Sequence, residues 1–237
     1  MNIKKSLRVV KASLTGKRIV HFLHIGKTGG TAIKYVLKRY PSTPEYEIFI
    51  HNHKTSLSDI HQSHGVIFFL RDPARRFVSA FYSRKREGKP RLYNPWSEGE
   101  RRAFERFETP RDLAEALDDS DPDTRESAID AMAEIGHIKN PYSQWLRSAE
   151  YLLSRRDDIL FVGFQESFEE DFLKLKEILK LPQEASLPTD DINTHRNPQN
   201  VDKRLSDRAL DNLKSWYRED YALMRLCEKE FGSRFHS

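Results

Sequence analysis

Residues 19–31 read IVHFLHIGKTGGT, and this stretch decides the fold. Its first part, Ile19–Ile25, is short, apolar and rich in β-branched residues, which is typical of a buried strand. A glycine-containing turn begins at Gly26, and apolar residues at helical spacing then predict a helix from about Thr31 to Pro41. A strand that leads through a glycine turn into a helix is a building unit of α/β folds.

Three further apolar segments are predicted as strands: Glu47–Ile50, Val66–Leu70 and Ile159–Gly163. Helices are predicted after the last two, over Pro73–Arg86 and Phe168–Leu179. This order favours an α/β fold with a central, mainly parallel sheet flanked by helices. Ligands of such folds bind at the carboxyl ends of the strands.

The 237 residues suit a single domain, with a charged helical insertion at about residues 88–140. Charged residues are dense there and apolar residues are sparse. Helices are predicted within this segment and at the C-terminus, over Glu100–Phe107, Arg111–Leu117, Thr124–Ile135, Ser206–Lys214 and Tyr217–Phe231.

The formal net charge is +4 and the pI is about 9.0, which suits an anionic ligand. No basic block dominates the chain, so nucleic acid is not an expected partner. The single cysteine, Cys227, excludes an internal disulfide and allows a reducing compartment. The N-terminal segment has no apolar stretch of signal-peptide length, so we expect a cytoplasmic protein without a transmembrane segment.

The loop Gly26–Thr31 has the composition of an anion-binding loop. Glycines let backbone amides close around an anion, and the helix N-terminus adds a partial positive charge. Lys27 supplies an ammonium group, while Thr28 and Thr31 supply hydroxyls. The Walker A pattern places its lysine after the second glycine, whereas Lys27 comes early, which disfavours an ordinary P-loop ATPase or kinase.

A second candidate site follows the strand Val66–Leu70. Arg71 stands at the end of that strand, and Ser79 lies about two turns into the next helix, roughly 10 Å along its axis. An arginine fork and a hydroxyl at this separation fit the 3′-phosphate of a nucleotide.

The two stretches together resemble sulfotransferases that use 3′-phosphoadenosine 5′-phosphosulfate (PAPS). HIGKTGGT at residues 24–31 is similar to their 5′-phosphosulfate loop, and LRDPARRFVSAFYS at residues 70–83 is similar to their 3′-phosphate motif. The resemblance is strongest over Val20–Arg86 and points to the carbohydrate group, which includes the heparan sulfate 2-O- and 6-O-sulfotransferases and sulfotransferase family 2.

This resemblance implies a P-loop-NTPase-like sulfotransferase fold and transfer of a sulfuryl group from PAPS to a hydroxyl, with a saccharide or glycoconjugate as the expected acceptor. No metal is required, because Lys27 neutralises the leaving group. The implied donor-binding residues are Lys27, Thr28, Gly29, Gly30, Thr31, Ala32, Arg71 and Ser79.

The acceptor hydroxyl needs a base, and His51-Asn52-His53 follows the second predicted strand. A histidine titrates near neutral pH and suits this role. The 2-O-sulfotransferases carry a comparable His-x-His, so His53 is the favoured base and His51 the second choice, with Glu45 or Glu47 as further alternatives.

Other interpretations stay open at this point. The chain could be a P-loop-like nucleotide kinase or NTPase, or a nucleotide-binding scaffold without catalysis. The aromatic patch at Tyr142 and Trp145 fits either an acceptor site or a core. The loop around His195 could close over a nucleotide, and the basic residues from Arg84 to Arg91 could meet an anionic polysaccharide.

Overall fold

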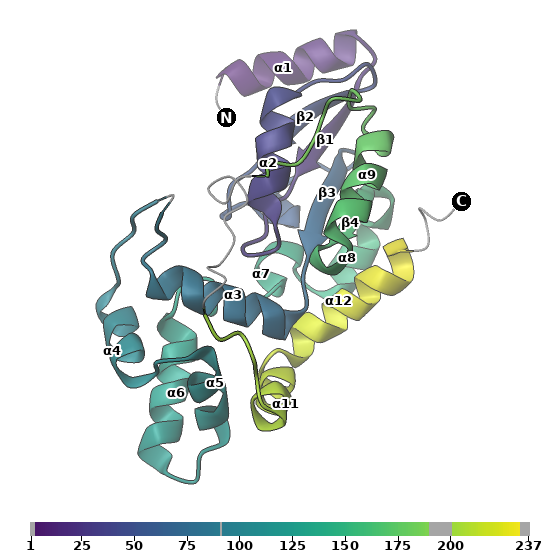
Figure 1. The fold of residues 1–237 in the computed structure, drawn as a ribbon. Coiled ribbons are helices and arrows are strands. Elements are labelled where there is room, and N and C mark those ends of the chain that lie inside the picture. The colour runs from purple at the N-terminus through teal and green to yellow at the C-terminus, as the bar shows by residue number, and fades with distance from the viewer. Residues whose placement is uncertain (1–2, 91, 190–200, 233–237) are drawn as a thin grey trace. The chain divides into compact units, whose positions relative to one another are not determined.

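The computed structural model describes residues 3–90, 92–189 and 201–232 (Figure 1). These residues form two compact units, each described here by itself. The first lies within Met1–Leu70, Tyr142–Thr194 and Leu223–Ser237, and the second within Arg71–Pro141 and His195–Ala222. The single domain expected from the sequence stays a prediction.

Within the described residues, the first unit is built on one four-stranded parallel sheet. Its strands are β1 (Arg18–Phe22), β2 (Tyr46–Ile50), β3 (Gly65–Leu70) and β4 (Ile159–Phe164), in the spatial order β2-β1-β3-β4. All four strands were predicted from their apolar runs, and the α/β fold class is confirmed. Because β1 lies between β2 and β3, the loop after β1 leaves the centre of the sheet edge where ligands bind in such folds.

Helices cover both faces of this sheet (Figure 1). One apolar cluster packs α2 (Gly30–Arg39) and α9 (Phe168–Ile178) against one face. On the other face, α7 (Ser143–Leu146), α8 (Ala149–Ser154) and the second half of α12 (Arg218–Phe231) cover a second cluster. Cys227 belongs to that cluster, and burial raises the pKa of its thiol, as expected for a core cysteine.

An N-terminal helix, α1 (Ile3–Leu14), was not predicted. It packs on β1 and β2 through Val9 and Ala12, which meet Ile19 and Phe49. Among the described helices, none is long and apolar enough to cross a bilayer.

The second unit is helical. It contains α3 (Pro73–Lys85), α4 (Glu98–Arg106), α5 (Pro110–Glu115), α6 (Pro122–Glu134), α11 (Asp207–Trp216) and the first turn of α12. Capping boxes begin α4 at Ser97 and α5 at Thr109, which fixes their starts despite the sparse apolar residues. Short 3₁₀ turns in the two units span Leu57–Asp59, Ala116–Asp118, Arg156–Asp158 and Gln165–Ser167.

Helix α3 is buried on its polar side as well as on its apolar side. Arg76 is only 2% exposed, lies 3.7 Å from Asp220, and donates to the carbonyl of Asn140. Ser79 and Ser83 are also buried. The sequence alone does not reveal the burial of these polar residues.

Candidate active site

The loop between β1 and α2 is shaped to receive an anion. Lys27 and Gly29 adopt positive φ angles of 68° and 84°, so the chain turns sharply before the helix. Gly29 is the N-cap of α2 and provides no side-chain cap. The first backbone N–H groups of α2 and the positive end of its dipole therefore face this loop, an arrangement that binds phosphate or sulfate oxygens.

Two of the predicted binding residues shape the loop through their own bonds. The buried Thr28 hydroxyl donates to the carbonyl of Ile25 at 3.1 Å. Because a hydroxyl has one hydrogen to donate, Thr28 offers a ligand its amide rather than its side chain. The amide of Ala32 donates to the carbonyl of Gly29 at 3.1 Å. Lys27 in this loop and Thr31 in the first turn of α2 are half-buried.

Gly29 and Gly30, at the start of α2, cannot carry a side chain without displacing an aromatic ring. A Cβ on Gly30 would lie 2.3 Å from Cδ2 and 2.8 Å from Nε2 of His24, and a Cβ on Gly29 would lie 2.7 Å from the ring of Phe168. His24 is 6% exposed. From the sequence, the glycines were expected to let the backbone close around an anion. Their packing against rings was missed, because Phe168 is distant in sequence and the position of the His24 ring depends on how the chain leaves β1.

His53 is held against the same loop. Its Nδ1 lies 2.9 Å from the carbonyl oxygen of His24, and the two imidazole rings are in tilted contact with centroids 4.1 Å apart. A carbonyl only accepts, so Nδ1 carries the proton and the lone pair of the neutral ring is on Nε2. The indole of Trp145 donates to the carbonyl of His53 at 2.8 Å and fixes the backbone. A general base needs such a lone pair on the nitrogen that meets the acceptor hydroxyl.

His51 has different partners from His53. Its Nε2 lies 2.8 Å from Nδ1 of His21, and Nε2 of His21 lies 3.0 Å from Nδ1 of His64. The three rings form a stacked row across β2, β1 and the start of β3. Burial lowers the pKa of His64, electrostatic interactions with His61 and Arg155 lower it further, and Asp158 opposes them.

Neither the histidine row nor the rest of the described chain shows a metal centre. Each nitrogen of His21 meets a different ring, so the three rings do not converge on one point. No group of three or more His, Cys, Asp or Glu in the described residues is arranged to hold a metal ion.

The glutamate alternatives lie at the other edge of the sheet. Glu47 is at the start of β2 and pairs with Arg8 at 2.6 Å, and Glu45 precedes it. The strands are parallel, so these residues are a strand length away from the loop that follows the carboxyl end of β1. The geometry therefore favours His53 among the candidate bases.

The second predicted motif lies in the second unit. Arg71 directly follows β3 and is half-buried, and Ser79 in α3 is 8% exposed. Asp72 caps α3 by accepting from the Arg75 amide at 2.8 Å, as the Asp-Pro sequence predicted, and Tyr221 donates to its other oxygen at 3.1 Å. The start of α3 is thus rigidly built around the position of Arg71.

Several secondary candidates have structural explanations. Tyr142 and Trp145 are buried in the core of the first unit. Arg84 is buried against Glu100, with two charge-assisted bonds of 2.6 Å, so it is not a surface contact for a polysaccharide. Arg91 and the loop around His195 lie outside the described residues.

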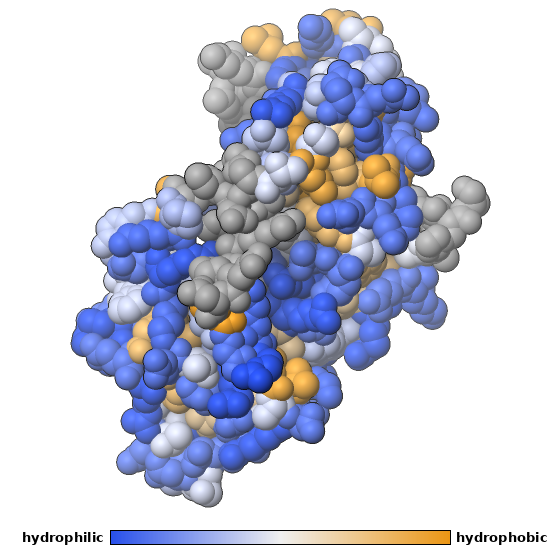
Figure 2. Space-filling model, viewed as in Figure 1, coloured by the Kyte–Doolittle hydropathy of each residue, from blue (hydrophilic) through white to orange (hydrophobic). Residues whose placement is uncertain are grey.

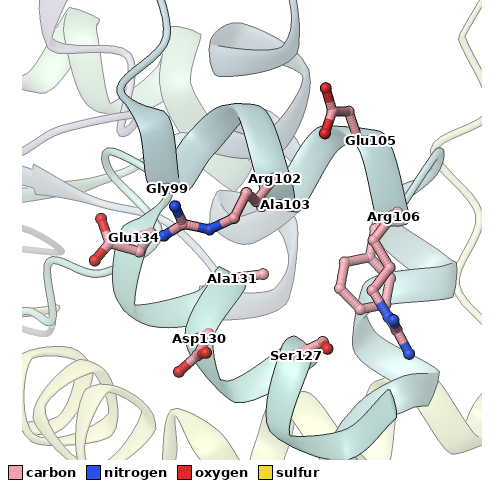
Figure 3. Close-up of a pocket in the computed structure, with 10 residues that line it drawn as sticks. Gly99, Arg102, Ala103, Glu105, Arg106, Ser127, Asp130, Ala131 and Glu134 are labelled. Atoms are coloured by element: carbon pink, nitrogen blue, oxygen red, sulfur yellow. The ribbon is translucent and has the colours of Figure 1, made fainter. Parts of the chain in front are cut away.

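The second unit also holds a cavity of about 540 Å³ between α4 and α6. Figure 3 shows Arg102 and Arg106 extending from α4, and Asp130 and Glu134 from α6. None of the predicted site residues lines it, and its mixed charges do not select an anion.

A parallel α/β sheet with a lysine-bearing glycine loop at a helix N-terminus is typical of proteins that bind phosphate or sulfate groups. The sequence profile of the sulfotransferase family matches residues 13–225, so the chain belongs to the sulfotransferase family and is a transferase of sulfuryl groups. The searches of curated proteins and of solved structures gave no match.

Proposed function

We propose that this protein transfers the sulfuryl group of PAPS to a hydroxyl of a carbohydrate, in the cytoplasm. Family membership supports sulfuryl transfer, and sulfotransferases generally use PAPS. The resemblance of residues 24–31 and 70–83 to the carbohydrate group supports a saccharide acceptor. A single, buried cysteine is compatible with a reducing compartment.

The residues of the glycine loop fit a 5′-phosphosulfate. Lys27, the amides at the start of α2 and the helix dipole all favour anionic oxygens, and no capping side chain competes for those amides. PAPS supplies the activated sulfuryl group when bound. Lys27 would neutralise the charge that develops on the leaving oxygen, which is the main electrostatic requirement of such a displacement.

The observation that carries the proposal is the bond between His53 Nδ1 and the carbonyl of His24. It fixes the tautomer with the lone pair on Nε2, and it holds this base at the residue that leads into the anion loop. His53 would take the proton of the acceptor hydroxyl, while Arg71 and Ser79 would hold the 3′-phosphate of the donor.

The test is calorimetric titration of the protein with adenosine 3′,5′-bisphosphate in EDTA, compared with ATP and magnesium. We expect the bisphosphate to bind without metal. Arg71→Ala should weaken bisphosphate binding by about 10–100-fold, the value of a charge-assisted contact. It should barely change binding of adenosine 5′-phosphosulfate, which lacks the 3′-phosphate.

Binding of ATP with magnesium and not of the bisphosphate would overturn the proposal in favour of a kinase-like protein. Bisphosphate binding without turnover on any hydroxyl acceptor would favour the scaffold alternative. Lys27→Ala provides a matched variant in the first unit. It should weaken binding of adenosine 3′,5′-bisphosphate and of adenosine 5′-phosphosulfate alike.

A further inference from the structure

Helix α1 is apolar on two opposite sides. Val9 and Ala12 face the sheet and pack on Ile19 and Phe49. Leu7, Val10 and Leu14 are 64%, 55% and 82% exposed. Positions i, i+3 and i+7 lie on one side of a helix, so these three residues form a stripe, here called the α1 stripe.

The α1 stripe has no protein cover among the described residues. Figure 2 shows hydrophobic side chains along the upper edge of the molecule, over α1. A helix of this kind is normally buried on both apolar sides, or rests with its outer side on another surface. Leaving two leucines and a valine in water stabilises nothing in the fold, which indicates a partner.

The charges around the α1 stripe indicate which partner. The helix sequence contains Lys4, Lys5, Arg8 and Lys11 and no acidic residue, and the first acidic residue of the chain is Glu45. Arg8 forms an ion pair with Glu47, while Lys11 is exposed. Exposed leucines together with the exposed Lys11, in a segment without acidic residues, match a surface of acyl chains and anionic headgroups.

We propose that α1 docks this protein on an anionic phospholipid surface. The helix has 12 residues and a length of roughly 18 Å, too short to cross a bilayer, so it lies in the interface plane with Leu7, Val10 and Leu14 inserted. The helix packs on Ile19, near the amino end of β1. Docking through α1 therefore leaves the Gly26–Thr31 loop, after the opposite end of β1, uncovered.

The experiment is co-sedimentation of the full chain with vesicles. We expect binding to equimolar phosphatidylcholine and phosphatidylglycerol and little binding to phosphatidylcholine alone. Binding should fall in about 1 M salt, which screens the lysines. Leu7→Ser/Leu14→Ser should weaken binding more than about tenfold, because two leucines no longer insert. Lys11→Glu should weaken it as well.

Leu173→Ser is the matched control, since Leu173 is also an exposed leucine on a helix of the first unit. It should bind like the unchanged protein, and circular dichroism checks that each variant is folded. Absence of binding to the anionic vesicles, or equal binding of the double variant, would overturn the proposal. Light scattering that shows a dimer lost in the double variant would assign the α1 stripe to a second copy instead. These outcomes are independent of sulfuryl transfer.

Discussion

The ring of His53 lies on the ring of His24, with centroids 4.1 Å apart and planes inclined by 37°, and Nδ1 of His53 donates to the carbonyl of the same residue. His24 in turn fills the space beside Gly30, the first residue of α2. Gly30, His24 and His53 thus form a continuous series of contacts from the anion loop to the candidate base. Because the three residues are closely packed, a displacement of one should displace the others.

Replacing His53 separates catalysis from donor binding. His53→Ala should lower sulfuryl transfer by about 10²–10⁴-fold, the usual contribution of a general base. Its affinity for adenosine 3′,5′-bisphosphate should be unchanged in calorimetry. His51→Ala is the matched comparison, because His51 contacts His21 rather than the loop residue His24. If His51→Ala abolishes transfer and His53→Ala retains it, the roles of the two histidines are reversed.

A methyl group at Gly30 should disturb both ends of this series of contacts. In Gly30→Ala the new Cβ would lie within 2.3 Å of the His24 ring, so the ring must move away from α2. We expect weaker bisphosphate binding in calorimetry and a changed nuclear magnetic resonance signal of the His53 ring. Gly232→Ala is the control, since nothing lies within 4 Å of a Cβ there. Unchanged binding and an unchanged His53 signal would show that the loop tolerates the displaced ring.

The sequence predicted the parts of the site whose signals are local. The apolar run, the glycine loop and the helix after it identified the loop around Lys27, and Asp72-Pro73 marked the start of α3. The His51-x-His53 pair was also visible. Each of these signals depends on a few consecutive residues, so the remainder of the chain does not alter its meaning.

The missing parts depend on register and packing. His64 joins His21 only because β3 begins at Gly65 opposite Val20, and a single sequence does not fix that register. The contact between His24 and Gly30 depends on how α2 packs on the sheet. The α1 stripe and the Val9 side of the same helix blur the 3.6-residue period, which explains why α1 was not predicted.

The second unit should depend on the buried pair of Arg84 and Glu100. Burial alone raises the pKa of the Glu100 carboxyl, but Arg84 and the amides of Gly136 and Ser97 outweigh it and hold the pKa below its ordinary value. Glu100→Ala leaves Arg84 buried without this carboxylate and should cost about 3–5 kcal/mol in denaturant unfolding. Glu98→Ala, at an exposed pair on the same helix, should cost much less, because solvent screens that pair.

The pH dependence of the free energy of unfolding provides a second test of the Arg84–Glu100 pair. A lowered carboxyl pKa contributes stability that is present above the unfolded value of 4.5 and is lost as the pH falls through the folded value. The unchanged protein should therefore lose more stability below about pH 4.5 than Glu100→Ala does. Equal acid sensitivity in both proteins would show that Glu100 does not provide this stabilisation.

The histidine row should make the first unit sensitive to milder acid. Burial is the largest cause of the lowered pKa of His64, so the unfolded chain, at 6.5, binds this proton more readily than the folded one. Stability should therefore fall as the pH drops below about 6.5, and His64→Asn should reduce this loss between about pH 7 and pH 5. Nuclear magnetic resonance titration should place His64 below 6.5. The exposed His61 supplies the control, since His61→Asn should leave most of the stability loss between about pH 7 and pH 5 unchanged. A His64 that titrates at or above 6.5 would contradict this prediction and would mean that Asp158 outweighs burial.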